Sequence, residues 1–177
     1  MGIHTGDSIS VSLCQTILPE DFFRMRAMSY RVAKAIDWEA GSFNVQFAKC
    51  HKTGRLVMIE VNARLSRSSA LASKATGIPI AVVATKLALG YSMQTLKEKF
   101  NFKEFYIYEK TDSVAVKLPI FQFEKLGCEN RFLKTYMQSV GEIMGIEKNF
   151  KCALLKAMEG GYVSSDDLFN LKKNYMN

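Results

Sequence analysis

Two short segments that alternate apolar and polar residues, with a turn between them, constrain the fold of this chain most. Residues 43–47 and 57–64 place an apolar side chain at every second position, which is typical of half-buried strands. Gly54 lies between them and suits the positive-φ position of a hairpin loop, so we expect a three-residue loop over residues 52–54. The pattern therefore predicts an antiparallel β-hairpin.

The predicted register of the hairpin groups polar side chains. Counting back from the loop places Gln46 opposite Glu60 and Asn44 opposite Asn62. Side chains alternate between the two faces of a strand, so these four residues should project from one face. The other face is predicted to form the core, and its side chains are Phe43, Val45, Phe47, Val57, Ile59 and Val61.

The polar face of the predicted hairpin brings carboxylate and amide oxygens together. These are the ligands that Mg²⁺ prefers, in company with substrate phosphates. Glu60 is central enough to bridge two divalent ions, with Gln46 completing one coordination shell and Asn62 the other. Taken alone, Glu60 and Asn62 are more often solvated surface residues than ligands. Finding them with Gln46 and with Arg64 at the strand end favours a metal site.

Composition excludes several classes of protein. The chain has 177 residues, of which 48% are hydrophobic and 23% charged, values that are ordinary for a globular protein with a real core. No apolar run is long enough to span a bilayer, and no signal peptide opens the chain. The cysteines are scattered without a CxxC pair, so we expect reduced thiols and a cytoplasmic location; they are Cys14, Cys50, Cys128 and Cys152.

The net charge of +7 comes from 24 basic and 17 acidic residues. The basic residues are spread along the chain rather than clustered, so nucleic acid is not an expected partner. An anionic ligand or an acidic partner fits the charge as well. The aromatic residues between 100 and 108 are interpreted as an irregular core or interface stretch rather than a base-stacking surface.

The remaining pattern predicts helices and further strands. A helix begins at Pro19, because proline and acidic residues suit the first turn. Its predicted buried stripe is Phe22, Met25, Val32 and Ile36. Two helices follow at about residues 70–76 and 80–89, and one at 148–158. Strands are predicted at residues 9–13, 114–118 and 141–146, whereas residues 91–111 show no legible pattern.

Several segments together resemble one enzyme family. Residues 2–8, 44–48, 59–64 and 66–77 occur in the order and spacing of the large chain of carbamoyl-phosphate synthetase, and residues 137–144 resemble the segment that closes its first ATP-grasp unit. The resemblance implies an α+β fold: an ATP-grasp large-lobe fragment with a mostly antiparallel sheet flanked by helices. It also implies two domains. Residues 1–163 would be the C-terminal part of an ATP-grasp domain, and residues 164–177 would start a helical oligomerisation domain.

The resemblance implies an ATP-dependent ligase that uses Mg²⁺ or Mn²⁺. His4-Thr5 and residues 66–71 are similar to the half that phosphorylates bicarbonate to carboxyphosphate, which ammonia then attacks on the way to carbamoyl phosphate. The implied partners are a glutaminase subunit or fused domain that supplies ammonia, and the remainder of the large chain. The product would serve pyrimidine or arginine synthesis. A membrane is not an expected partner, and the fragment alone is expected to be inactive.

The resemblance also implies site residues. Those expected to contact ATP are Gly2, Ile3, His4, Gln46 and Glu60. Those expected to bind the divalent metal are Gln46, Glu60 and Asn62. Those expected to be catalytic are Asn44, Arg64 and Arg67. Arg64 would hold the transferring phosphoryl group, and Arg67 with the backbone amides of Ser68 and Ser69 would bind carboxyphosphate. A potassium site is expected near the Ile3 carbonyl and Ser8.

Two alternatives stay open. The Glu-x-Asn-x-Arg pattern of residues 60–64 is shared by other ATP-grasp carboxylases and ligases, although residues 66–77 argue against them. A truncated remnant without catalytic activity is the second alternative. The sequence of the flanking gene region would separate these alternatives best.

Overall fold

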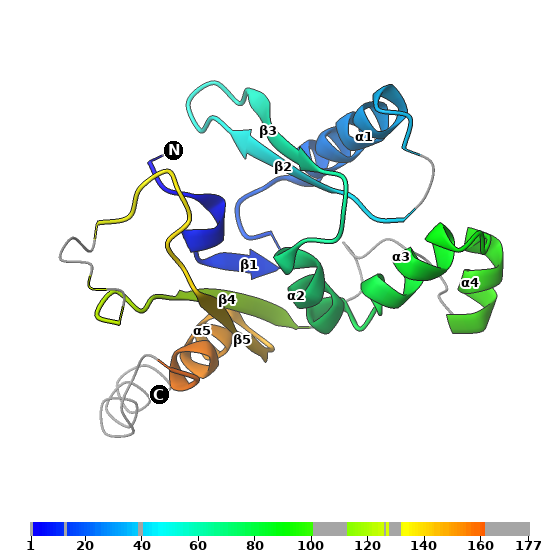
Figure 1. Ribbon diagram of the computed structural model, residues 1–177. Helices are drawn as coiled ribbons and strands as arrows, with labels where there is room; N and C mark the ends of the chain where they lie inside the picture. The colour runs from blue at the N-terminus through cyan, green and yellow to red at the C-terminus, as the bar shows by residue number, and fades with distance from the viewer. Residues whose placement is uncertain are drawn as a thin grey trace. The chain divides into compact units, whose positions relative to one another are not determined.

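A computed structural model describes residues 2–12, 14–38, 41–100, 113–125, 127 and 132–161 (Figure 1). The chain forms two compact units. Unit 1 comprises Met1–Gln15 and Lys110–Asn177, and unit 2 comprises Thr16–Glu109. Both units lie within the predicted first domain for most of their length. The predicted boundary at residue 164 lies outside the described residues.

Unit 1 contains a three-stranded antiparallel sheet in the order β1-β4-β5. β1 spans Ser10–Ser12, β4 spans Val114–Ile120 and β5 spans Gly141–Glu147, so the three strands predicted here are confirmed. A short 3₁₀ turn, η1, spans Thr5–Asp7 before β1, and helix α5 spans Phe150–Glu159 after β5.

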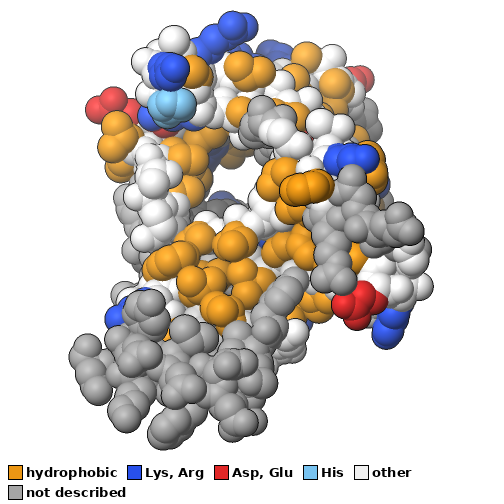
Figure 2. All heavy atoms as spheres, turned by 90° about the vertical axis from the view of Figure 1, so that its left-hand side faces the viewer, with side chains coloured by type: hydrophobic (Ala, Val, Ile, Leu, Met, Phe, Trp, Pro, Cys, Tyr) orange, Lys and Arg blue, Asp and Glu red, His pale blue; other side chains and the backbone are white. Residues whose placement is uncertain are grey.

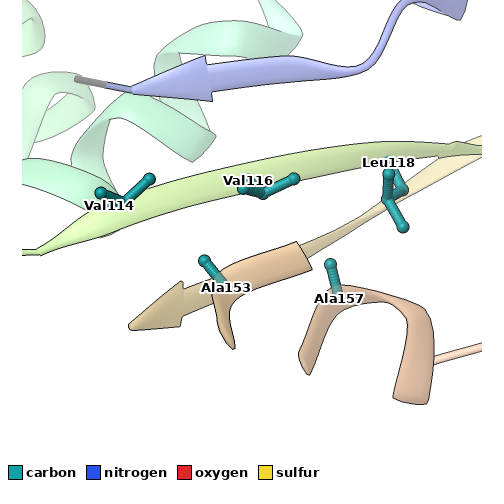
Figure 3. Close-up of a cluster of buried hydrophobic side chains, with 5 residues drawn as sticks. All are labelled: Val114, Val116, Leu118, Ala153 and Ala157. Carbon is teal, nitrogen blue, oxygen red and sulfur yellow. The ribbon is translucent and has the colours of Figure 1, made fainter. Parts of the chain in front are cut away.

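The core of unit 1 lies between β4 and α5. Val116 and Ala153 are fully buried, and Figure 3 shows their cluster. Its members are Val114, Val116, Leu118, Ala153 and Ala157. Gly145 on β5 permits this packing, because a Cβ there would lie 2.1 Å from the Ala153 carbonyl oxygen and 2.6 Å from the Ala157 nitrogen. Only glycine fits so close to a helix backbone.

Unit 2 begins with helix α1, Pro19–Ala35, which has proline in its first turn as predicted. Its buried residue is Asp21, whose carboxylate accepts a hydrogen bond from Lys49 of the neighbouring strand and lies 3.6 Å from Arg24 Nη1. The predicted stripe is half-buried at Phe22, Met25 and Val32, and it is wrong at its end. Ile36 is 48% exposed, because the helix ends at Ala35 and Ile36 forms its C-cap.

The hairpin of unit 2 consists of β2, Asn44–Lys49, and β3, Leu56–Asn62. The predicted pairs Gln46–Glu60 and Asn44–Asn62 are confirmed. The predicted loop is one residue too short, because Cys50 N–H bonds to the Arg55 carbonyl at 2.9 Å and leaves residues 51–54 in the loop. A register shift follows Gln46, where Phe47 pairs with Met58 and Ile59 is the extra residue of a bulge. The longer loop shifts the register by one residue and the bulge shifts it back, so the predicted pairing is restored at Gln46 and Asn44.

The bulge corrects the predicted division of the hairpin into faces. Beyond it Met58 shares a face with Phe47, whereas Val57 pairs with Ala48 and joins the face of the polar residues. The predicted hairpin core is confirmed only in part, because Phe43, Val45, Phe47 and Val61 are half-buried. Val57 is 43% exposed and Ile59 is 41% exposed, because a two-stranded sheet is covered less completely than the three-stranded sheet of unit 1.

Three helices complete unit 2: α2, Arg67–Thr76, α3, Ile80–Ala88, and α4, Met93–Phe100. α2 begins three residues before the predicted start and ends at Gly77, whose φ of 73° gives it the left-handed cap conformation. The sequence pattern missed α4, and residues 101–112 lie outside the described part of the chain. No single described helix is long and apolar enough to cross a membrane, although α2 and α3, bent by 117°, pass that test as a pair.

Large hydrophobic side chains remain exposed in both units. In unit 1, Phe132 is 79% exposed and Tyr136 is 56% exposed, and in unit 2 the exposed group includes Met58. Figure 2 shows hydrophobic side chains at the surface on the face that it draws.

Candidate functional site

Two polar cross-strand pairs form the centre of the candidate site. Asn44 lies opposite Asn62 and Gln46 lies opposite Glu60. Directly opposed residues of an antiparallel pair have Cβ atoms about 4.5–5.5 Å apart, and residues two apart share a face. The four side chains therefore form one patch at the end of β2 and β3 away from the hairpin loop. This grouping confirms the geometry predicted from the sequence.

Two oxygens of this patch are unusual. Asn44 Oδ1 and Gln46 Oε1 are buried, and neither has a hydrogen-bond partner among the described residues. Buried polar atoms nearly always have a partner, and each exception needs an explanation. A hard cation would satisfy both amide oxygens at once, since Mg²⁺ accepts such ligands. The donor set therefore fits the divalent metal that the sequence pattern implies.

Glu60 supplies the negative charge of the patch. Its side chain is exposed, and its Oε1 accepts a hydrogen bond of 2.9 Å from Asn62 Nδ2. The Asn62 amide thus orients the carboxylate, and its own Oδ1 is left to act as a ligand. Across the described ranges, no group of three or more His, Cys, Asp or Glu could hold a metal. The candidate site therefore relies on one carboxylate and amide oxygens, and phosphate oxygens would complete the coordination shell.

Two arginines follow the patch along the chain. Arg64 is exposed, and its Nη1 donates to the Leu65 carbonyl at 3.0 Å. Arg67 is the first residue of α2 and is also exposed. Ser66 precedes it, and its N–H donates to Ser69 Oγ at 3.1 Å. The N-terminus of α2 is thereby held in shape, and its positive dipole end and the two guanidinium groups favour an anion in this part of unit 2.

The residues predicted to contact the nucleotide outside the hairpin belong to unit 1. Gly2 and Ile3 are exposed, and His4 is half-buried at the start of η1. His4 Nδ1 accepts the Gly6 N–H at 3.0 Å, and Ser8 Oγ donates to the His4 carbonyl at 3.4 Å. The structure thus groups the hairpin residues within unit 2 and, separately, the opening-loop residues within unit 1. The potassium site at Ile3 and Ser8 stays a prediction.

Sequence reasoning missed the residues that anchor this opening loop. Asp7 is only 3% exposed and accepts the backbone N–H groups of Gln138 and Ser139, each at 2.9 Å. Burial raises the pKa of the Asp7 carboxyl, but the hydrogen bonds from Gln138 and Ser139 outweigh this effect and hold the pKa below its usual range. No local pattern could have revealed this contact, because the partners are more than 130 residues apart.

Comparison with known proteins places these features in a family. Residues 1–96 match the family described as "Carbamoyl-phosphate synthase L chain, ATP binding domain". The carbamoyl phosphate synthase large chain of Thermotoga neapolitana is 50% identical over 159 residues, which is 89% of this chain and 14% of the relative. Those of Myxococcus xanthus and Thermus thermophilus are each 48% identical, over 89% and 90% of this chain, and over 15% and 16% of the relatives.

Solved structures support the fold. The biotin carboxylase domain of 2-oxoglutarate carboxylase from Hydrogenobacter thermophilus, solved with MgADP, ADP and bicarbonate, aligns with a TM-score of 0.59 and 16% identity. The match covers 85% of this chain and 38% of that chain. Rhizobium etli pyruvate carboxylase aligns with a TM-score of 0.63 and 14% identity, over 85% of this chain and 18% of that chain. These likenesses show the ATP-grasp fold.

The sequence relatives and the solved structures agree on one type of domain. The chain spans only about one-seventh of the length of the curated relatives that it matches. The identity of 48–50% extends over 89–90% of this chain, and therefore over residues of both units. The chain therefore belongs to the family of the carbamoyl-phosphate synthase L chain ATP-binding domain.

Proposed function

We propose that this chain is part of a carbamoyl phosphate synthase large chain and that it helps ATP to phosphorylate bicarbonate. The observation that carries the proposal is the pair of buried, unpartnered oxygens of Asn44 and Gln46 beside Glu60 and Asn62. In a chain of this family, that arrangement has the composition of a Mg²⁺–nucleotide site. The neighbour solved with MgADP and bicarbonate supports the same substrate class.

Each residue of the patch has a role that follows from its contacts. Gln46 and Asn44 offer amide oxygens that need a partner, and Glu60 offers a carboxylate held by the Asn62 amide. Arg64 and Arg67 offer exposed guanidinium groups, which match phosphate oxygens two at a time. A bound divalent ion would neutralise charge on the transferring phosphoryl group. Mg²⁺ fits this donor set, and Mn²⁺ would take the same ligands.

The remaining parts of the proposal concern the complete enzyme. The opening loop with His4-Thr5 and the Ser66–Leu71 segment support assignment to the bicarbonate-phosphorylating half. Ammonia would come from a glutaminase subunit or domain, a potassium ion would bind near Ile3 and Ser8, and residues 164–177 would begin a helical domain. The cytoplasmic location that the sequence predicts is part of the same proposal.

The test is Glu60→Gln in the complete large chain with its glutaminase. Removal of one preorganised electrostatic contact costs on the order of 10²–10³ in rate, and loss of a metal-binding carboxylate should cost at least that. Overall synthesis and bicarbonate-dependent ATP hydrolysis should both fall by this amount. ATP formation from ADP and carbamoyl phosphate, which reports on the other half, should survive.

Glu20→Gln is the matched control, because it makes the same change in charge at an exposed position of α1. It should leave all three assays unchanged. A Glu60→Gln enzyme that keeps bicarbonate-dependent hydrolysis but loses ATP formation would show that this segment belongs to the carbamate-phosphorylating half. An enzyme with all activities intact would remove Glu60 from the site altogether.

A further inference from the structure

The buried carboxylate of Asp7 is not among the ligand-binding groups of the candidate site. Burying a charged group is costly unless it is fully hydrogen-bonded. Asp7 meets this condition with backbone donors from one segment, since Oδ2 accepts from Gln138 N–H and Oδ1 from Ser139 N–H, each at 2.9 Å. A carboxylate that binds two successive amides fixes both position and orientation of the turn that carries it.

A second buried charge fixes the residue beside Asp7. Lys117 lies on β4, is 8% exposed, and donates from Nζ to the Gly6 carbonyl at 3.1 Å. Ser139 Oγ donates to the same oxygen at 3.4 Å. The turn η1 is therefore bound from β4 and from the segment before β5. These donors lie 111 and 133 residues from Gly6 in sequence, so the network holds only in the folded unit.

The orientation of the Gly6 N–H determines which ring nitrogen of His4 carries the proton. Gly6 N–H donates to His4 Nδ1 at 3.0 Å, and His4 N–H donates to the Lys134 carbonyl at 3.0 Å. A ring nitrogen that accepts a hydrogen bond carries no proton, so the neutral imidazole carries its proton on Nε2. His4 thereby presents Nε2–H as a donor, the group that an anionic phosphate oxygen needs.

We infer that Asp7 is a positioning residue, which holds η1 on Gln138 and Ser139 so that Gly6 keeps His4 in the Nε2–H form as a phosphate donor. The inference rests on the proposed function in one respect, that the opening loop binds ATP. Asp7 itself would not touch the nucleotide. Asp7 acts on the His4 ring through the Gly6 N–H, which donates to His4 Nδ1. Lys117 contributes to the same positioning, because it donates to the Gly6 carbonyl.

The chain contains only two histidines, His4 and His51, so the ring nitrogens can be observed directly by ¹H–¹⁵N NMR of the 177-residue chain at a pH where both rings are neutral. In the wild type, His4 should show one protonated and one unprotonated ring nitrogen, with the proton on Nε2. His51 is exposed in the hairpin loop and serves as the internal reference. A wild-type His4 that exchanges between both tautomers would overturn the inference without any variant.

Asp7→Asn keeps the shape of the side chain but can accept only with its carbonyl oxygen, so one of the two amide bonds is lost. The separation between the His4 ring-nitrogen signals should collapse towards that of mixed tautomers, while the signals of His51 stay unchanged. Asp37→Asn, at an exposed position, is the control with the same change in charge. A folded Asp7→Asn chain that keeps the Nε2–H form would overturn the role of Asp7.

If Asp7→Asn does not fold, Lys117→Met tests the same anchor by removing the donor to the Gly6 carbonyl. It must also mix the His4 tautomers, and an unchanged His4 spectrum would overturn the inference. Addition of Mg²⁺ and ADP then tests the nucleotide part separately. The His4 Nε2 signal of the wild type should move, and it should move less in the variant. If wild-type His4 keeps one tautomer but its Nε2 signal does not move when Mg²⁺ and ADP are added, nucleotide binding by His4 in this chain is refuted. The conclusion about the tautomer is then unaffected.

Discussion

At the scale of single residues, the polar atoms differ in whether they have hydrogen-bond partners within the protein. Asn44 and Gln46 have buried oxygens without hydrogen bonds among the described residues. Asp7 shows the opposite condition, with both carboxylate oxygens bonded to backbone amides. The two amide oxygens can still accept a hydrogen bond or a cation, whereas the hydrogen bonds of the Asp7 carboxylate are already made within the protein.

Cys50 is another residue whose chemistry follows from its immediate neighbours. It is exposed beside the hairpin loop. A hydrogen bond from the Thr53 side chain lowers the pKa of the Cys50 thiol, and the backbone groups of Thr53 and Lys52 add to this effect. A lowered pKa means a larger thiolate fraction at any pH below the ordinary thiol range, and the thiolate is the reactive form.

We therefore predict that iodoacetamide alkylates Cys50 faster at pH 8 than it does in a Thr53→Val chain, with a rate that is half-maximal below the pH typical of a free thiol. Peptide mass spectrometry of timed samples measures the rate. Cys14, also exposed, should react equally in both chains and serves as the control. Equal rates at Cys50 in the two chains would contradict the role of Thr53.

At the scale of elements, β5 and α5 pack so closely that a side chain at Gly145 of β5 would collide with backbone atoms of α5. A Cβ at position 145 would lie 2.1 Å from the Ala153 carbonyl oxygen of α5. This contact is with backbone atoms, which cannot rotate away as a side chain can. The strand and helix must separate to accept a methyl group, and the cluster that includes Val116 and Ala153 would lose its close packing.

Gly145→Ala should accordingly lower the free energy of unfolding by about 2 kcal/mol or more, in the upper part of the range for an overpacked core. Urea unfolding followed by circular dichroism measures the change. Gly141→Ala is a matched control on the same strand, because its Cβ would meet only Ile120 side-chain atoms at 3.5 and 3.8 Å. Similar losses of stability in the two variants would argue against the close approach at Gly145.

At the scale of the whole molecule, each unit by itself exposes residues that the sequence predicts to contact ligands. Glu60, Arg64 and Arg67 are exposed in unit 2, and Gly2 and Ile3 are exposed in unit 1. Phosphoryl transfer to bicarbonate requires that water be kept from the reacting groups. The chain spans 14–16% of the length of its curated relatives, so most of the length of those proteins lies outside these 177 residues.

The purified 177-residue chain is expected to release no phosphate from ATP above background, with or without bicarbonate. A coupled phosphate assay in the presence of Mg²⁺ measures this. Release that rises with bicarbonate and is lost in Glu60→Gln would contradict the expectation and make the chain an enzyme by itself. Release that survives Glu60→Gln would indicate a contaminating ATPase.

Local sequence determined most helix and strand positions and the family of the chain. The alternation of residues 43–47 and 57–64 was sufficient to place Asn44 and Gln46 on one face of their strand and Glu60 and Asn62 on one face of theirs, because a period of two is a property of each strand alone. Gly77 and Pro19 marked helix ends for the same reason, since φ angles and a missing N–H act on the nearest residues. The polar patch at the centre of the site therefore follows from the local pattern of the two strands.

Only the tertiary structure decided which of these features are buried and what they touch. The bulge at Ile59 and the longer loop cancel at Gln46 and Glu60, and alternation alone cannot reveal a pair of errors that offset each other. The most completely buried strand is β4 rather than either strand of the hairpin, because burial depends on how many layers cover a strand. The Asp7 anchor joins residues more than 130 positions apart, and such a contact exists only once the chain has folded back on itself.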